Sequence, residues 1–163
     1  MIGFVIAMEI EAAPIIELLD TNKQFLLAGK KCYKGALLGY DVALIVSEIG
    51  KVNAASAAQA LITRYPEIDK IINIGVAGAV NTELKICDVC VVEKSLQYDF
   101  DLTAIDDVPL GFIQNIKQQY IYGDKKMYGN LMTLFNRSVT VASADRFSTK
   151  EEETNLIRSL GGD

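Results

Sequence analysis

The sequence predicts an α/β domain of three layers, in which a mixed central β-sheet is flanked by helices. One observation is that strand-like and helical stretches alternate along all 163 residues. Another is that residues 2–7 form a continuous apolar run, which is typical of a strand covered on both faces. The composition, with 50% hydrophobic and 23% charged residues, is that of a globular chain.

The first helix is expected within residues 9–20, where apolar side chains recur at helical spacing. Pro14 is tolerated without cost only in a first helical turn, so the regular helix is expected to begin nearer residue 12 than residue 9. Strands are expected next, with turns at Gly29 and Gly39, over residues 23–28, 31–38 and 41–47.

The rest of the chain continues to alternate. Gly50 opens an Ala-rich helix that is expected to end near Arg64, before Pro66. Residues 99–123 lack a sustained period and predict a long loop, which in a compact domain tends to be functional. The other expected elements are a buried strand at 69–75, strands at 86–98 and 137–143, and helices at 124–135 and 149–160.

Charge and composition exclude several classes of protein. The formal net charge is -5 and no Lys/Arg cluster is present, which argues against nucleic acid and anionic membranes as partners. No apolar run is long enough to span a bilayer, and the apolar start lacks the basic leader of a signal peptide. Together with the small number of cysteines, this predicts a cytoplasmic protein.

Cys87 and Cys90 have the spacing of half a zinc site. We interpret them as part of a strand, in which residues three apart face opposite sides. The sequence contains neither a second cysteine pair nor any histidine to complete four ligands. We therefore expect no metal and no cofactor, and the lack of histidine also excludes a Ser-His-Asp triad.

Polar or glycine-rich segments follow the predicted strands, at the positions where α/β folds bind ligands. Ala7–Glu11 places Glu9 and Glu11 where the first strand becomes a helix, although acidic residues also occur there simply because they complement the helix dipole. Ser47–Ala55 joins a strand to a helix, and an ordinary turn is the alternative interpretation. Small side chains in Asn73–Ala79 would let a flat ligand approach the main chain, but the dinucleotide motif G-x-G-x-x-G is absent.

The last such segment, Val141–Ser148, is a strand that ends in a polar turn. It contains one aromatic residue, Phe147, for which a place in the core is the alternative. In this order and spacing, A-M-x-x-E, I-G-K-V-x-A-A, I-I-N-x-G-x-A-G and S-x-D-x-F resemble the methylthioadenosine/S-adenosylhomocysteine nucleosidases of the purine nucleoside phosphorylase superfamily. The resemblance covers essentially the whole chain and implies a nucleoside phosphorylase-like fold in a single domain over residues 1–163.

The resemblance also implies an activity and a partner. The reaction is hydrolysis of the N-glycosidic bond of methylthioadenosine or S-adenosylhomocysteine to adenine and the thioribose product, by a homodimer without cofactor. Glu11 matches the carboxylate that activates the attacking water, and residues 104–113 match the loop that helps to close the partner's pocket. The implied nucleoside-binding residues are Ile49, Val76, Ala77 and Gly78 near the ribose and base, Phe147 stacked on the purine, and Ser148, whose backbone faces the base.

In the family, an Asp protonates the leaving purine and a Glu after a Met holds the ribose hydroxyls. Both lie in a strand-helix-strand-helix segment that follows the part matched here, so we expect a domain that is incomplete at its C-terminus and nearly inactive alone. Tyr98 stands where the family often has His, and Val76 and Ala79 replace Ser and Gly, which puts the substrate preference in doubt.

A phosphorylase of this superfamily needs several arginines to hold phosphate, and one of these arginines lies near the first strand. Glu9, Glu11 and Glu48 stand at the corresponding places here, which favours water over phosphate as the attacking group. The alternatives are a phosphorylase, a hydrolase of a related nucleoside such as futalosine, and a domain that binds a nucleoside without turning it over.

Overall fold

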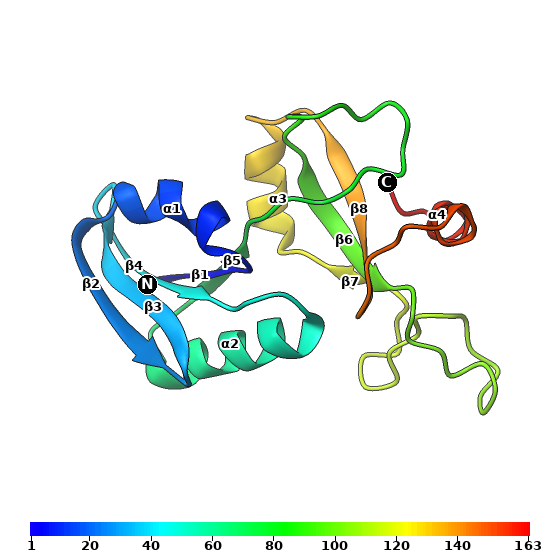
Figure 1. Ribbon diagram of the computed structural model, residues 1–163, viewed down its shortest axis with the longest axis horizontal. Coiled ribbons are helices and arrows are strands. Elements are labelled where there is room, and N and C mark those ends of the chain that lie inside the picture. The colour runs from blue at the N-terminus through cyan, green and yellow to red at the C-terminus, as the bar shows by residue number, and fades with distance from the viewer. The chain divides into compact units, whose positions relative to one another are not determined.

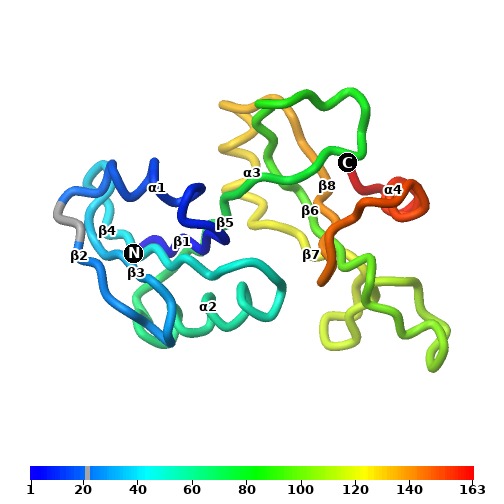
Figure 2. Tube along the Cα trace, viewed as in Figure 1, coloured from blue at the N-terminus to red at the C-terminus, as the bar shows by residue number. Residues whose placement is uncertain are grey.

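The computed structural model describes residues 1–20 and 23–163 (Figure 2). The described chain divides into two compact units, Met1–Ala77 and Gly78–Asp163. The single domain expected over residues 1–163 stays a prediction. No helix within the described ranges combines the length and the apolar character that a membrane span requires.

The first unit is organised around a mixed sheet that has five strands among the described residues, in the order β2-β3-β4-β1-β5 (Figure 1). β1 runs parallel to β4 and to β5, whereas β2, β3 and β4 pair antiparallel in succession. The parallel pairs bring the carboxyl ends of β1, β4 and β5 to one edge of the sheet. The strands are β1 (Ile2–Ile6), β2 (Asp20–Leu27), β3 (Lys30–Leu37), β4 (Tyr40–Val46) and β5 (Lys70–Asn73).

Tight turns join the antiparallel strands at the expected glycines. Ala28 and Gly29 have φ angles of 51° and 78°, and Leu38 and Gly39 have φ angles of 51° and 82°. Positive φ at both central residues defines the type I′ turn, whose twist matches that of the flanking strands. The turn positions predicted from the sequence are therefore confirmed.

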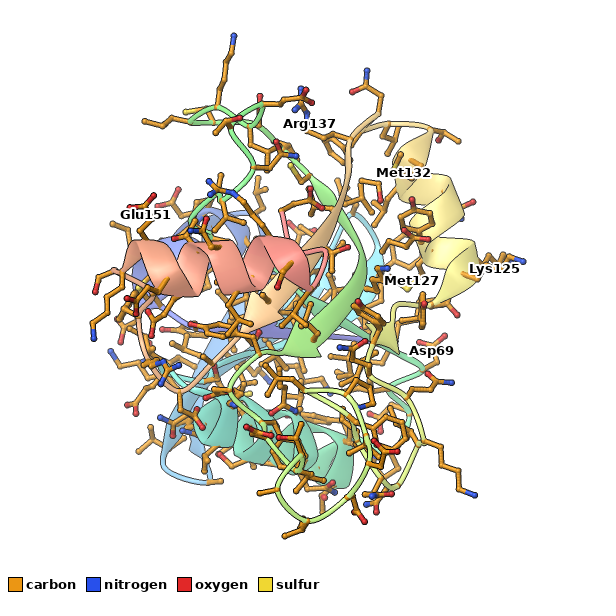
Figure 3. All side chains as sticks on the ribbon, turned by 90° about the vertical axis from the view of Figure 1, so that its right-hand side faces the viewer. Asp69, Lys125, Met127, Met132, Arg137 and Glu151 are labelled. Atoms are coloured by element: carbon orange, nitrogen blue, oxygen red, sulfur yellow. The ribbon has the colours of Figure 1, made fainter. Side chains whose placement is uncertain are left out.

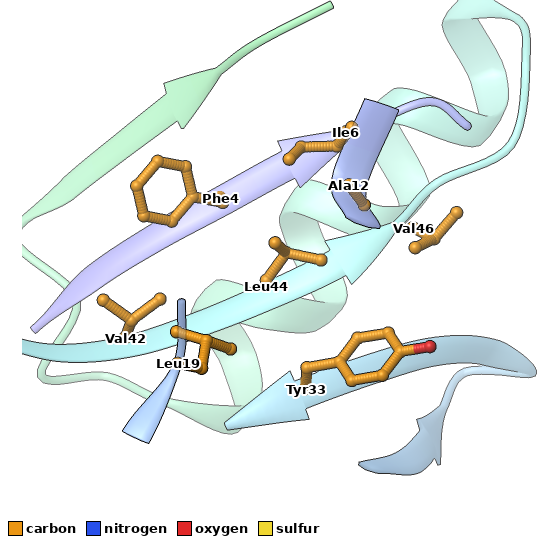
Figure 4. Packing of buried hydrophobic residues seen from close by; sticks show 8 residues of the cluster. All are labelled: Phe4, Ile6, Ala12, Leu19, Tyr33, Val42, Leu44 and Val46. Carbon is orange, nitrogen blue, oxygen red and sulfur yellow. The ribbon is translucent and has the colours of Figure 1, made fainter. Parts of the chain in front are cut away.

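Helices cover both faces of this sheet: α1 (Glu9–Glu17) and α2 (Lys51–Arg64). Because side chains alternate along a strand, Phe4 and Ile6 pack on the α1 side and Val5 packs on the α2 side. Figure 4 shows the cluster on the α1 side, with Ala12 of the helix close to Ile6. Burial of a side chain such as Ile6 contributes about 1.5–3 kcal/mol. The expected layered α/β arrangement is confirmed.

The first helix starts earlier than expected. It begins at Glu9, so the expected start near residue 12 is wrong, and Pro14 lies inside it. The backbone N–H of Met8 donates to Oε2 of Glu11 at 2.9 Å, which satisfies a donor just ahead of the helix and fixes its start there. The missing N–H of Pro14 removes one bond from the helix, which ends soon afterwards at Glu17.

The strand expected to be buried at 69–75 is the exposed edge strand β5. Lys70 and Asn73 are exposed, and Ile71 retains 37% of its accessible surface. The prediction of burial was wrong because β5 has a single sheet neighbour in the described chain, β1, whereas β1 is paired on both sides. A central strand and an edge strand have similar apolar sequences here, and only the strand order distinguishes them.

The second unit contains a smaller sheet, with three strands in the described residues in the order β7-β6-β8. β6 (Val91–Gln97) runs parallel to β8 (Ser138–Ser143) and antiparallel to β7 (Ile121–Tyr122). Figure 3 shows Lys125 and Met132 at the two ends of α3 (Lys125–Met132), and Glu151 at the start of α4 (Glu151–Ser159). The core joins β6 to α4 through Leu96, Tyr98 and Ile157.

The long loop expected over 99–123 has little regular structure apart from β7 at its end and a bridge between Ile113 and Gln118. β6 begins at Val91, so the C-x2-C segment precedes the strand, and its interpretation as part of a strand was wrong. Asp88 N–H donates to Lys85 O at 3.0 Å, which closes a turn with Cys87 at φ 72°. Among the described residues, no group of three or more His, Cys, Asp or Glu side chains is placed to hold a metal ion.

Candidate active site

Glu11 lies at the corner where β1 turns into α1. Its Oε2 accepts a hydrogen bond from the Met8 N–H at 2.9 Å, and its Oε1 accepts one from the Val76 N–H at 2.9 Å. The first bond closes the start of the helix, and the second reaches the segment that follows β5. The half-buried carboxylate is thereby fixed at the carboxyl ends of the parallel strands.

The small residues after β5 allow this approach. A Cβ atom on Gly75 would lie 3.1 Å from Oε1 of Glu11, closer than an ordinary contact. Asn73 Nδ2 donates to Val5 O at 2.8 Å and ties the end of β5 to β1. The Asn73–Ala79 segment thus brings its main chain to the carboxylate, so space, and not an unusual φ angle, explains the glycine.

Glu9 has different surroundings from Glu11. It forms an ion pair with Lys31 of β3 on the surface, where both side chains are exposed. The hydrogen bond and the charge of Glu9 raise the pKa of Lys31 above its ordinary value. The two carboxylates that lie close together in the sequence therefore have different partners. Glu9 pairs with a lysine, and Glu11 accepts hydrogen bonds from backbone amides.

The turn after β4 carries Ile49. Ser47 N–H donates to Ile6 O at 2.8 Å, and the chain then turns into α2 through Glu48 at φ 66° and Gly50 at φ 111°. Ile49 is 58% exposed. An open depression at the ends of β1 and β4 is lined by Ala7, Met8, Glu9, Val46, Glu48, Ile49 and Asn53.

The structure brings some of the predicted site residues together. Glu11 and Val76 are in direct contact, and Ile49 lines the depression, whereas Glu11 is not among the residues that line it. Ala77 is exposed at the end of the first unit, and Gly78 is exposed at the start of the second. The carboxyl ends of parallel strands are where an open α/β sheet binds ligands.

Phe147 and Ser148 lie in the turn between β8 and α4, in the second unit. Phe147 is 79% exposed and Ser148 is also exposed, so the alternative of a core position for Phe147 is excluded. A large aromatic side chain with most of its surface in water is available for stacking on a flat ligand.

The residues next to Phe147 are held in place. Arg146 Nε pairs with Oε1 of Glu153 in α4 at 2.8 Å, and its guanidinium lies 5.9 Å from the centre of the Tyr98 ring. Asp145 N–H donates to Oδ2 of Asp99 at 2.8 Å. These contacts hold the turn against α4 and the residues that directly follow β6, while the neighbouring Phe147 ring stays exposed.

Tyr98, at the position where the resembling family often has His, is 3% exposed and packs in the core with Leu96 and Ile157. It is therefore a packing residue in this unit. One backbone bond and one side-chain bond anchor the 104–113 loop: Gly111 N–H donates to Phe100 O at 2.8 Å, and the Gln119 side chain donates through Nε2 to Leu110 O at 2.9 Å.

Sequence reasoning missed the residues that support the site. Lys30 at the start of β3 donates to the turn after β4 and to Asn53 of α2. The Arg146–Glu153 pair was missed as well. An asparagine near the start of an Ala-rich helix was the available signal for Asn53, whereas nothing in the spacing linked Lys30 to Ser47.

Comparison with known proteins gives relatives that match almost the whole chain. The 5'-methylthioadenosine/S-adenosylhomocysteine nucleosidase of Tolumonas auensis is 31% identical over 164 residues, which cover 96% of this chain and 70% of that protein. The aminodeoxyfutalosine nucleosidase of Campylobacter jejuni is also 31% identical, with coverage of 94% and 69%. Both relatives are nucleosidases, which confirms the expected enzyme class.

Solved structures agree with these relatives. The methylthioadenosine/S-adenosylhomocysteine nucleosidase of Campylobacter jejuni has a TM-score of 0.89 and 30% identity, covering 99% of this chain and 72% of that one. The futalosine hydrolase of Helicobacter pylori has a TM-score of 0.89 and 30% identity, covering 97% and 70%. Because residues 1–163 also match the sequence profile of the phosphorylase superfamily from end to end, the chain belongs to that superfamily.

Proposed function

We propose that this chain binds a purine nucleoside of the methylthioadenosine or S-adenosylhomocysteine type and contributes Glu11 to hydrolysis of its N-glycosidic bond. The products would be adenine and the thioribose. The observation that carries the proposal is the Glu11 carboxylate, which the amides of Met8 and Val76 orient at the carboxyl end of β1.

The chemistry suits a carboxylate that is held in this way. Cleavage of the bond develops positive charge on the ribose, which a nearby fixed carboxylate stabilises more strongly in the transition state than in the ground state. Each carboxylate oxygen has about two acceptor sites, so a site on each oxygen of Glu11 remains after the amide bonds. A water bound there would be oriented and deprotonated as it attacks.

The depression beside this corner favours hydrolysis over phosphorolysis. Its lining includes Glu48 and Glu9, of which Glu9 is paired with Lys31, and the described residues that line it include no arginine. Phosphate is usually held by bidentate arginine, and carboxylates repel it. A related nucleoside is the second candidate substrate, because a relative that is also 31% identical is an aminodeoxyfutalosine nucleosidase.

The remaining roles rest on the resemblance. We assign Phe147 to stacking on the purine with Ser148 beside the base, and we assign the pocket wall near the ribose and base to Ile49, Val76, Ala77 and Gly78. A homodimer in which residues 104–113 close the partner's pocket, and a cytoplasmic role in methionine salvage, belong to the same proposal.

The resemblance matches no residue between 1 and 163 to the Asp that protonates the purine. A general acid contributes about 100- to 10,000-fold in rate. For the 163-residue chain alone we therefore expect nucleoside binding with release of adenine slowed by roughly that factor.

The test measures adenine release from methylthioadenosine by this chain and by the product of its complete gene, each with and without phosphate. Calorimetry measures nucleoside binding in parallel. Release by the complete product that does not depend on phosphate supports hydrolysis, and dependence on phosphate indicates a phosphorylase. Release from aminodeoxyfutalosine alone favours the second candidate, and absence of both binding and release overturns the proposal.

A further inference from the structure

Lys30 reaches from the start of β3 to the turn that follows β4. Its Nζ donates to Ser47 O at 2.8 Å and to Oδ1 of Asn53 at 3.0 Å. Asn53 Nδ2 in turn donates to Ile49 O at 2.9 Å. The two bonds of Lys30 are partly buried, so water competes less for them than it would on an open surface. Lys30 and Asn53 thus link the turn to both β3 and α2.

The turn that they hold has an unfavourable backbone. Glu48 has a φ of 66°, in the left-handed region that a residue with a Cβ atom rarely adopts. Such a conformation persists only where the surrounding groups fix it. Three successive carbonyls each accept a side-chain donor in the described structure: Ser47 O from Lys30, Glu48 O from Ser47 Oγ at 2.9 Å, and Ile49 O from Asn53.

The same turn forms one wall of the depression at the strand ends. Glu48, Ile49 and Asn53 line this depression, whereas Lys30 is not among its lining residues. Lys30 therefore holds these lining residues without lining the depression itself, through its bonds to the Ser47 carbonyl and the Asn53 amide oxygen. Without its ammonium group, the turn would lose the donor to Ser47 O and the link to Asn53 that help to hold Ile49 at the depression.

We propose that Lys30 is a positioning residue for the nucleoside site, which fixes the Ser47–Gly50 turn and so sets the affinity without touching the nucleoside. The inference rests on the proposed function, which assigns Ile49 to the pocket wall near the ribose and base. A site whose competent conformation is only partly populated binds more weakly in proportion to that population.

The main variant is Lys30→Met, which keeps the length of the side chain and removes its donors. We expect the Kd for methylthioadenosine to rise roughly tenfold, as for the loss of a hydrogen bond to a charged group. We also expect faster backbone amide exchange in the peptide that spans residues 47–53. In the complete gene product, KM should rise by the same factor while kcat stays unchanged.

Matched variants separate positioning from charge and from general stability. Lys126→Met removes the same charge from an exposed position of α3 and should change neither the Kd nor the exchange. Lys30→Arg keeps a charged donor and should recover most of the affinity. Asn53→Asp keeps an acceptor for Lys30 but loses the donor to Ile49 O, so its Kd should also rise.

The outcomes distinguish this inference from the proposed function. A folded Lys30→Met chain with the affinity and exchange of the unmodified chain overturns the role of Lys30. If Lys30→Met does not fold, amide exchange of residues 47–53 in Asn53→Asp decides, because Asn53 itself lines the depression and its Kd also reports the new charge. Unchanged exchange overturns the inference, and faster exchange supports it. Failure of the unmodified chain to bind methylthioadenosine overturns the proposed function, while unchanged exchange in Lys30→Met overturns the positioning itself.

Discussion

Glu11 and Phe147 each follow the carboxyl end of a parallel strand, β1 in the first unit and β8 in the second, but their surroundings are opposite. Glu11 is half-buried and accepts hydrogen bonds from the amides of Met8 and Val76. Phe147 is 79% exposed, and the contacts of its turn are made by its neighbours Arg146 and Asp145. The proposed catalytic residue therefore supports the fold of its unit, whereas the proposed stacking residue does not.

The difference follows from what each role needs. A carboxylate that activates water must be oriented, and the bonds that orient it also stabilise the protein. An aromatic ring that stacks on a base must keep one face free until the ligand arrives. Substitutions should therefore affect stability and activity together at Glu11, and binding alone at Phe147.

The largest effect is expected for Glu11→Gln. Adenine release by the complete gene product should fall about 100- to 10,000-fold, because an amide cannot take up the proton of the attacking water. The free energy of unfolding should fall by about 1–3 kcal/mol, because the new NH2 group faces a backbone N–H donor. Urea unfolding and chromatographic assay of adenine measure both effects.

Glu9→Gln is the matched control for that variant. It removes only the surface ion pair with Lys31, so the free energy of unfolding should change little, because water screens an exposed ion pair. If Glu11→Gln were as stable as Glu9→Gln, the claim that the Glu11 carboxylate supports the fold would be wrong.

Alkaline pH should weaken the first unit through Cys32, which is fully buried on the α2 side of the sheet. Burial raises the pKa of its thiol to about 11 from an ordinary value of 9.0. Between these values the unfolded chain has lost a proton that the folded chain retains, so stability falls as pH rises. The total loss should be about 2–3 kcal/mol.

Urea unfolding of the wild type and of Cys32→Ala between pH 8 and pH 11 measures this contribution together with a smaller one from Tyr65, whose pKa is raised by burial and also by the charge of Cys32. We expect a shallower alkaline loss in the variant, and faster amide exchange of β3 than of β6 in the wild type at high pH. If the free energy of unfolding fell equally with pH in the two proteins, the buried thiol would not be the cause of the alkaline loss.

Glu48→Gly should stabilise the first unit, because glycine adopts the φ of 66° without steric cost. After the greater entropy of glycine in the unfolded chain is subtracted, a gain of about 0.5–1 kcal/mol remains. Cys87→Gly, at φ 72° in the second unit, should act in the same direction. Thermal unfolding checks both, with Glu17→Gly in α1 as a helical control that should lower Tm.

The smallest effect on stability is expected for Phe147→Ala. Its free energy of unfolding should stay within about 0.5 kcal/mol of the wild type, since the ring is exposed. Nucleoside binding should weaken by about 1–3 kcal/mol, the usual contribution of a base stacked on an aromatic ring. Phe135→Ala, at 38% exposure, should lose more stability and keep its affinity. If calorimetry gave the two variants equal affinity for the nucleoside, the assignment of Phe147 to the binding site would be wrong.

The order of helices and strands was predictable because local patterns encode it. The apolar run of β1, the turns at Gly29 and Gly39 and the Ala-rich helix after Gly50 are all found where the sequence placed them. The errors have two sources, one in the strand order and one in a local bond at the start of a helix. β5 is an exposed edge because of its place in the strand order, and α1 starts at Glu9 with the Glu11 carboxylate bound to the Met8 amide.

The sequence by itself determined which chemical groups follow each strand, and their order along the chain led to the nucleosidase resemblance. Only the tertiary structure decided which partner each group has. Glu9 and Glu11 share a residue type and a helical turn, and they differ because parallel pairing of β5 with β1 brings Val76 to one of them. Lys30 and Ser47 meet because β3 and β4 are neighbours in the sheet. Local periodicity specifies which face of a strand is apolar, whereas such contacts depend on the order in which the strands pair.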